Sequence, residues 1–144
     1  MKIEYMKCKL VREKECSFEL VQSPSAAAEV LLDLNMNEAS EEYVYMLCLN
    51  CRGEITAVHE VAHGTLSECP MSVRSVFSRA LLSGSASVII AHNHPSGDPT
   101  PSQTDIDVTE KLKSAGKLLE IPVIDHLIIG SDKSFYSFKA NGQI

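Results

Sequence analysis

The sequence predicts an α/β fold of three layers, in which helices flank a mixed β-sheet. Two observations carry this prediction: strand-like apolar runs alternate with helical patterns, and a hairpin lies among the crossover units. The chain has 144 residues, of which 44% are apolar and 22% charged. These are ordinary values for a globular protein, so we expect residues 1–144 to form one domain with one core.

The first half of the chain is expected to contain strands, a helix and a hairpin. Weak alternation in the first twenty residues suggests one or two strands. A Ser-Pro pair at 23–24 suits an N-cap and a first helical residue, and this helix should end near Asn35. Apolar runs at 42–49 and 54–62, separated by a turn at 50–53, predict the hairpin.

A second helix and a buried strand come next. Pro70 is expected to open the helix and Gly84 to end it. The short apolar run Ser87–Ala91 has the pattern of a strand buried on both faces, and it leads directly into His92. The helix has one apolar stripe at 3.6-residue spacing, made of Val73, Val76, Phe77, Ala80 and Leu81.

A third helix and two strands complete the expected fold. Residues 100–103, Thr-Pro-Ser-Gln, fit a capping box with proline in the first helical position, so the helix should start at Pro101. It should run to about Leu119. Strands are then expected at 123–129 and 135–138.

Charge and hydropathy exclude several classes of protein. A formal net charge of −6 opposes tight non-specific binding to nucleic acid, which depends on clustered Lys and Arg. No apolar run approaches the roughly 18 residues that span a bilayer, and no signal-peptide pattern opens the chain. We therefore expect a cytoplasmic protein without a membrane segment.

The cysteines are expected to be reduced thiols. The chain has five of them, an odd number, in a protein large enough to build a core without disulfides. Cys48 and Cys51 have the spacing of a redox or zinc pair, but no second pair follows them. We interpret them as a packing residue and a turn residue.

The strongest chemical signal is His92-Asn93-His94, which follows the buried strand. Alternate residues of an extended chain point the same way, so both imidazoles can face one metal ion. Asp105 falls on the apolar stripe of the third helix, where an unpaired carboxylate is costly, and Ser102 lies one turn earlier. Two imidazoles and one carboxylate suit Zn²⁺ in an open, catalytic type of site.

A simpler interpretation of the same residues stays open. Ser102 could cap the helix while Asp105 complements its dipole, with the two histidines in a surface loop. A helix that starts at Ser102 would favour this alternative.

A zinc hydrolase also needs a general base, usually a glutamate. Four glutamates lie in extended segments: Glu41, Glu42, Glu54 and Glu60. Glu42 shares a strand face with Val44 and Met46, which could leave it half-buried at a strand end. Spacing alone does not choose among the four.

The spacing of His92, His94, Ser102 and Asp105 resembles the JAMM (MPN⁺) metalloprotease signature. Residues 91–102 resemble more narrowly the bacterial RadC branch of that superfamily. The resemblance extends over roughly 24–139, with further similar blocks at 64–65, Arg74, Phe77, 79–81 and 125–130. It implies a JAMM/MPN-like (cytidine deaminase-like) fold with flanking helices.

The resemblance also assigns roles to residues. It implies that His92, His94 and Asp105 bind zinc, while Ser102 holds the water or stabilises the oxyanion. The catalytic glutamate of the family precedes the first core strand and matches Glu42, with Glu41 one residue away. The implied activity is a zinc-dependent JAMM-type metallohydrolase that cleaves an amide, peptide or isopeptide bond in a protein or peptide substrate.

Two other functions belong to different classes. MPN domains that have lost their ligands act as non-catalytic interaction modules, and the RadC name implies an accessory factor in DNA repair or mobile-element processes. Longer RadC proteins resemble helix-hairpin-helix DNA-binding proteins at their N-terminus. No such region is visible in this chain, so direct DNA binding is not expected.

Three more histidines call for an interpretation. The pair Asp125-His126 matches the family, so His126 either lines the substrate cleft, lies in the second shell of the metal or is a hydrogen-bonded structural histidine. His59 and His63 have no carboxylate at fitting spacing and are interpreted as ordinary strand residues.

Overall fold

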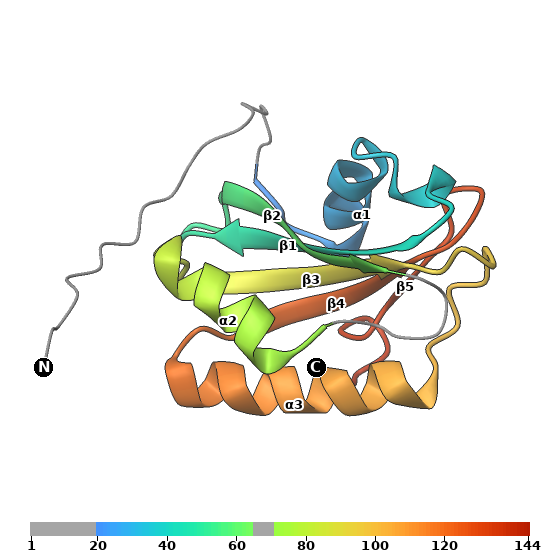
Figure 1. Ribbon diagram of the computed structural model, residues 1–144. Coiled ribbons are helices and arrows are strands. Elements are labelled where there is room, and N and C mark those ends of the chain that lie inside the picture. Colours follow the sequence, from blue (N-terminus) through green and yellow to red (C-terminus); the bar gives the residue numbers. More distant parts are fainter. Residues whose placement is uncertain (1–19, 65–70) are drawn as a thin grey trace, which may run out of the picture.

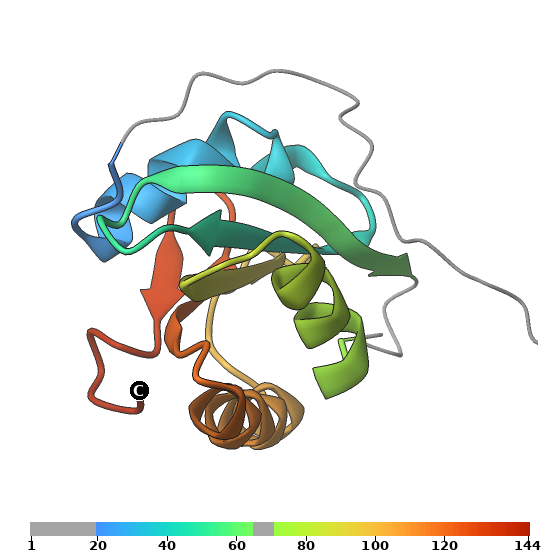
Figure 2. The ribbon, with the colours of Figure 1, turned by 90° about the vertical axis from the view of Figure 1, so that its left-hand side faces the viewer.

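Helices enclose a five-stranded sheet in the computed structural model, which describes residues 20–64 and 71–144. Helix α1 (Pro24–Leu32) lies on one face of the sheet, and α2 (Val73–Leu82) and α3 (Gln103–Leu119) lie on the other (Figures 1 and 2). The predicted three-layer α/β architecture is confirmed. The strands predicted in the first twenty residues fall outside the described part of the chain.

Helix α1 begins where the sequence predicts. Ser23 caps it through a hydrogen bond of 3.1 Å to a first-turn amide, and Pro24 is its first residue. The helix ends at Leu32, before the predicted end near Asn35, which adopts a left-handed conformation with φ of 59°. A 3₁₀ turn, η1 (Met36–Glu38), then leads into the sheet.

The predicted hairpin is confirmed as strands β1 (Glu42–Leu49) and β2 (Ile55–Gly64). Asn50 organises the turn, because its side-chain oxygen accepts two backbone N–H groups at 2.8 and 3.0 Å. Gly53 supplies the positive φ of 81° that the turn requires. Strand β2 continues two residues beyond its predicted end at Ala62.

Helix α2 starts later than predicted. It begins at Val73 instead of Pro70, because Ser72 and Ser75 cap each other reciprocally at 3.0 and 3.1 Å. The predicted stop is confirmed, since Gly84 follows the helix with φ of 63°. On the predicted apolar stripe Val76, Phe77 and Ala80 are buried, whereas Leu81 is 57% exposed.

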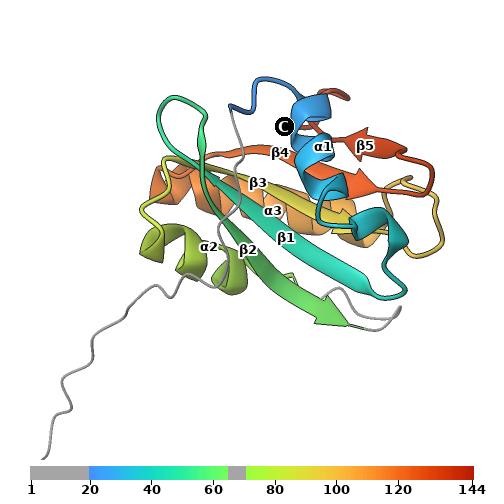
Figure 3. The ribbon, with the colours of Figure 1, turned by 90° about the horizontal axis from the view of Figure 1, so that it is seen from above.

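The sheet is mixed, as predicted. Its strand order is β2-β1-β3-β4-β5, with β3 (Ser87–Asn93), β4 (Val123–Ile129) and β5 (Phe135–Ser137). Strands β3 and β4 are parallel and are joined through α3, while every other neighbouring pair is antiparallel. Figure 3 shows α1 crossing above the sheet and α3 beneath it.

Two apolar layers hold the sheet between its helices. One packs under α2 and α3 and includes Val44, Met46, Val88, Ile90 and Leu112. The other packs under α1 and includes Leu31, Leu47, Ile89, Ala91 and Leu127. The alternation along β1 and β3 therefore decides which side chains reach α3.

Among the described residues, no helix combines the length and apolar character that a membrane span requires.

Candidate metal centre

His92 lies near the end of β3, and its side chain is buried between the sheet and α3. Its backbone lies opposite Val44 of β1 and beside Ile128 of β4, and its side chain is fully buried. Because Val88 and Ile90 of the same strand face α3, alternation directs the His92 ring to that side as well. The predicted position of His92 at the end of a buried strand is confirmed.

His94 leaves the strand and is held by the loop that follows. Its amide donates to the Ile129 carbonyl at 3.0 Å, and its ring Nδ1 donates to the Asp98 carbonyl at 2.8 Å. Gly97 allows the loop to pack closely against the turn that follows β4, since a Cβ there would lie 2.8 Å from Ser131 Oγ. These contacts turn the second nitrogen, Nε2, toward His92.

Asp105 and Ser102 cap the start of α3 together. The predicted start at Pro101 is wrong, because the helix begins at Gln103 with Ser102 as its N-cap. Asp105 N donates to Ser102 Oγ at 3.2 Å, while Asp105 Oδ2 accepts from Ser102 N at 2.7 Å and from Ser102 Oγ at 2.6 Å. This reciprocal capping box competes better for the N-cap position than the predicted one at Thr100.

The capping role does not exclude a metal. Asp105 Oδ1, the other carboxylate oxygen, lies 3.1 Å from His92 Nε2, and the Asp105 side chain is only 5% exposed. The simpler interpretation was right that Ser102 caps the helix, but its surface loop is not observed, since His92 is buried.

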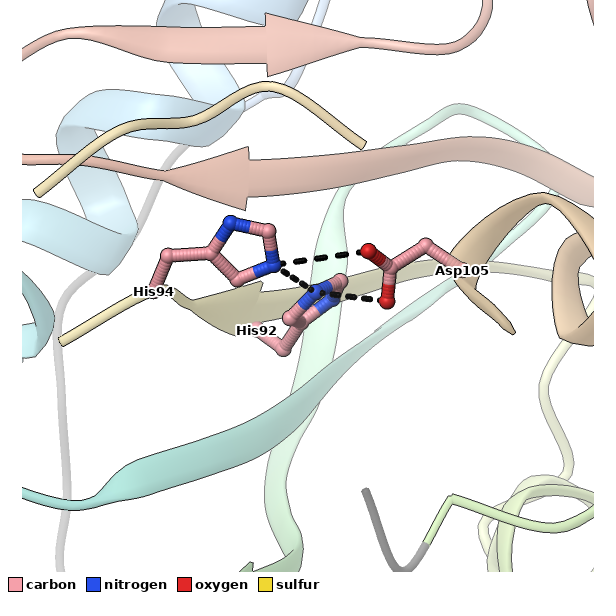
Figure 4. A group of neighbouring side chains, drawn as sticks. All are labelled: His92, His94 and Asp105. Atoms are coloured by element: carbon pink, nitrogen blue, oxygen red, sulfur yellow. Dashed lines mark hydrogen bonds and ion pairs between the residues drawn. The ribbon is translucent and has the colours of Figure 1, made fainter. Parts of the chain in front are cut away.

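His92, His94 and Asp105 form a group that can hold a metal ion, and we call it the ligand triad. Figure 4 shows the three side chains pointing toward one another. The His92 Nε2 to His94 Nε2 distance is 3.0 Å, and His94 Nε2 lies 3.4 Å from Asp105 Oδ2. Bonds of about 2.0–2.1 Å in a tetrahedral zinc site place ligand atoms about 3.3 Å apart, so this donor set fits such an ion.

The electrostatics of the ligand triad favour a cation. Burial by itself would raise the pKa of the Asp105 carboxyl, but hydrogen bonding and charge from His92 and His94 hold it well below its usual range. The pKa of His94 is raised, first by the hydrogen bond to Asp105, against the effect of burial, with smaller contributions from the Asp98 carbonyl and Glu42. The carboxylate therefore stays ionised beside two imidazoles.

Glu42 is the glutamate that the strand places beside the triad. It lies two residues before Val44, the partner of His92, so alternation puts it on the face of β1 that looks toward α3. Glu42 is half-buried, whereas Glu41 is exposed.

Asn93, between the two histidines, anchors this part of β1. Its side-chain oxygen accepts from Tyr43 N at 2.7 Å, and its amide donates to the Glu41 carbonyl at 2.9 Å. Because these two bonds flank Glu42 on both sides, Asn93 ties the start of β1 to the strand that carries His92. No pattern in the sequence indicated this role for Asn93.

His126 lies behind His92 and is fully buried. Its Nε2 is 2.8 Å from His92 Nδ1, and its Nδ1 is 2.6 Å from Thr109 Oγ1. Of the three interpretations left open, contact with a ligand of the triad and structural hydrogen bonding both apply. Thr109 was missed, although it lies four residues after Asp105 and hence on the same helix face.

The remaining candidates lie outside the triad. Glu54 accepts from Asn50 at 2.6 Å in the hairpin turn, at the opposite end of β1, and Glu60 pairs with exposed His63 at 2.7 Å. His59 contacts Ser83 at 2.7 Å. Both histidines are strand residues, as predicted. Neither member of the Cys-x-x-Cys pair is in a disulfide, with Cys48 buried and Cys51 exposed.

Fold and site together define a class, namely α/β domains with a mixed sheet and a His-His-Asp group that can bind a metal ion. A family model described as the RadC-like JAB domain matches residues 21–143. The chain belongs to this family.

Relatives agree with this assignment. A UPF0758 protein from Clostridium beijerinckii is 40% identical over 124 residues, which cover 86% of this chain and 53% of that protein. One from Roseiflexus castenholzii is 39% identical over 122 residues, which cover 85% of this chain and 52% of that protein. The chain thus spans about half the length of the curated relatives it matches.

Proposed function

We propose that this domain is a zinc-dependent hydrolase that cleaves an amide, peptide or isopeptide bond in a protein or peptide substrate. The observation that carries the proposal is the convergence of three ligand atoms, His92 Nε2, His94 Nε2 and an Asp105 oxygen, at separations of 3.0–3.4 Å. Membership of the RadC-like JAB family supports it.

In this proposal the ligand triad holds Zn²⁺, which supplies Lewis acidity for water activation and carbonyl polarisation. Glu42 is the general base that takes a proton from the attacking water, and it then returns the proton to the leaving amine. Its support is positional, because Glu42 is half-buried on the triad side of β1 while Glu41 is exposed.

Ser102 has a double role in the proposal. In the structure its hydroxyl donates to Asp105 Oδ2 at 2.6 Å, which orients that carboxylate. When a substrate is bound, rotation of the hydroxyl would direct the same hydrogen toward the oxygen that gains charge.

A non-catalytic interaction module is the weaker alternative. The family positions for metal ligands hold His92, His94 and Asp105, and the three side chains converge, whereas a pure interaction module does not require them to. No feature of the site favours a DNA-binding role, and the net charge of −6 opposes one.

Metal analysis and turnover together test the proposal. The wild-type protein, loaded and then dialysed, should retain about one equivalent of zinc, and His94→Ala should lose it. Glu42→Gln should keep the zinc but lose roughly 10²–10⁴-fold in the cleavage of a fluorogenic peptide library, while Glu41→Gln serves as the matched control. A zinc content below about a tenth of an equivalent in the wild type, or an unchanged zinc content in His94→Ala, would contradict the proposed metal site.

A further inference from the structure

A continuous chain of hydrogen bonds runs behind the ligand triad and returns to it. The backbone carbonyl of Asp105 lies 2.6 Å from Thr109 Oγ1, which lies 2.6 Å from His126 Nδ1. On the far side of that ring, His126 Nε2 lies 2.8 Å from His92 Nδ1. The chain thus begins on the main chain of one triad residue and ends on the ring of another.

The direction of every hydrogen in this chain follows from its first member. A carbonyl oxygen only accepts, so the single hydroxyl hydrogen of Thr109 points to the Asp105 carbonyl. Thr109 Oγ1 has no second hydrogen, so His126 Nδ1 must be the N–H donor in their contact. The His126 ring is fully buried, and its two nitrogens contact Thr109 Oγ1 and His92 Nδ1, neither of which is a carboxylate. An unpaired charge there would be costly, so the ring is neutral and Nε2 carries a lone pair.

The hydrogen position on His126 fixes the one on His92. With His126 Nε2 as an acceptor, His92 Nδ1 must donate to it, because two lone pairs do not form a hydrogen bond at 2.8 Å. A neutral His92 ring then carries its other lone pair on Nε2, the atom that faces Asp105. His94 can also bind a metal through Nε2, since its Nδ1 donates to the Asp98 carbonyl. Without a metal, the 3.0 Å contact between the two Nε2 atoms takes its hydrogen from His94, because His92 Nε2 is the acceptor.

We propose that Thr109 and His126 are positioning residues that hold His92 in the one tautomer able to bind a metal through Nε2. This inference rests on the proposed zinc site. Outer hydrogen bonds of this kind set the tautomer and the orientation of metal-bound histidines. Here the geometry adds that Asp105 supplies both a ligand oxygen and, through its carbonyl, the start of the chain that prepares its fellow ligand.

The opposite direction of the same hydrogen bonds would block the proposed metal ligand. If Thr109 instead donated to His126, each hydrogen along the chain would shift, and His92 Nε2 would carry an N–H that points at Asp105 Oδ1, 3.1 Å away. No heavy atom would need to move. The hydrogen bond from Thr109 to the Asp105 carbonyl therefore selects between two tautomers of His92. One has a lone pair on Nε2 that can bind a metal, and the other has an N–H there that cannot.

Nitrogen NMR of the metal-free protein tests the tautomer directly. Long-range ¹H–¹⁵N correlation spectra should show the wild-type His92 ring protonated at Nδ1 and His126 protonated at Nδ1. In Thr109→Val the His92 signal should shift toward the Nε2–H form, and Thr109→Ser should restore the wild-type pattern. Finding His92 as the Nε2–H tautomer in the metal-free wild type would overturn the inference, and that measurement needs no variant to fold.

Zinc affinity, measured by competition with a chromophoric chelator, provides the second readout. Thr109→Val and His126→Phe, which keeps the ring that stacks on Phe138, should each bind zinc about 10–100-fold more weakly than the wild type. Thr109→Ser should recover most of the affinity. Thr56→Val is the matched control, because Thr56 also bonds a backbone carbonyl, that of Cys48, far from the triad.

The two proposals fail in different ways. A wild-type protein that binds no zinc contradicts the proposed function, whereas the tautomers remain measurable in its absence. Wild-type zinc binding together with unchanged affinity and unchanged His92 tautomer in Thr109→Val contradicts the role of the hydrogen-bond chain alone.

Discussion

Two polar clusters lie on the same face of the sheet, near opposite ends of β3, and they differ in what their polar atoms meet. The ligand triad lies where β3 ends, and its ligand atoms face one another. The other cluster, which we call the distal cluster, lies where β3 begins and comprises Cys48, His59, Ser83 and Ser85. In it, the buried Ser85 Oγ makes no hydrogen bond of ordinary geometry among the residues that the structure describes, and its neighbour, the Cys48 thiol, is a weak partner.

The comparison shows that nucleophilic and titratable side chains do not by themselves make a site. Both clusters are partly buried, and each has a histidine with a lowered pKa: His126 contacts the triad from outside it, and His59 belongs to the distal cluster. Only the triad directs several ligand atoms at one point while an outer chain satisfies the remaining nitrogens. Converging ligand atoms with outer hydrogen bonds therefore distinguish a candidate metal centre from a group of buried polar side chains.

The largest expected effect comes from removing the one charge of the triad. Asp105→Asn keeps the shape and an oxygen that can still accept from Ser102, but it removes the anionic ligand. We expect zinc affinity to fall by more than about 100-fold, beyond the 10–100-fold typical of outer-shell changes. Isothermal titration calorimetry measures this.

His59→Ala in the distal cluster is the control and should leave the zinc affinity unchanged. Equal losses of zinc affinity in Asp105→Asn and His59→Ala would contradict the expectation that the triad, and not the distal cluster, binds the metal.

Replacing two serines should affect the free energy of unfolding differently, as measured by chemical denaturation of the metal-free protein. Ser102→Ala removes the N-cap of α3 and should lower the free energy of unfolding by about 1 kcal/mol. Ser85→Ala removes a buried hydroxyl that makes no hydrogen bond of ordinary geometry in the described chain, so we expect no loss, or a gain of up to about 1 kcal/mol. A loss in Ser85→Ala comparable to that in Ser102→Ala would show that Ser85 is satisfied after all.

The smallest expected effect is an acid-dependent change in the distal cluster. Burial, with the charge of Arg79, lowers the pKa of His59, so the unfolded chain binds a proton more readily than the folded protein. The stabilisation from neutral His59 is complete above the unfolded value of about 6.5 and is lost as the pH falls toward the folded pKa. Thermal melts of the chelator-treated protein should therefore show a weaker decline below that pH in His59→Asn.

His63→Asn provides the comparison, because His63 is an exposed histidine of the same strand and lies outside the distal cluster. A steeper decline in His59→Asn than in the wild type would contradict the sign of this linkage.

Much of the site could be predicted because it depends on periodicity. The inward orientation of Asp105 depends on spacing within the helix, so it survived the wrong start at Pro101. Likewise, alternation along β1 is enough to place Glu42 on one strand face with Val44 and Met46. Patterns of this kind are local, and a short stretch of sequence contains them.

The parts that could not be predicted join distant residues. The bonds from Asn93 to Tyr43 and to the Glu41 carbonyl join residues 50 and 52 positions apart in the chain, and no local pattern encodes them. Thr109 was overlooked for another reason: a search for an apolar stripe passes over a buried polar residue. The start of α2 depended on which residue provides the N-cap, here Ser72 before Val73, and propensity alone does not decide this.

Asn93 has a consequence for protein engineering. A designer who copied only the two histidines and the aspartate onto another scaffold would transfer the candidate ligands alone. The two hydrogen bonds of Asn93, which align β1 and its Glu42 with β3, would be lost. The asparagine of the His-Asn-His motif is therefore part of the minimal transplant. A graft with any other residue there should carry the candidate metal ligands, but Glu42, the proposed general base, should no longer be held in place.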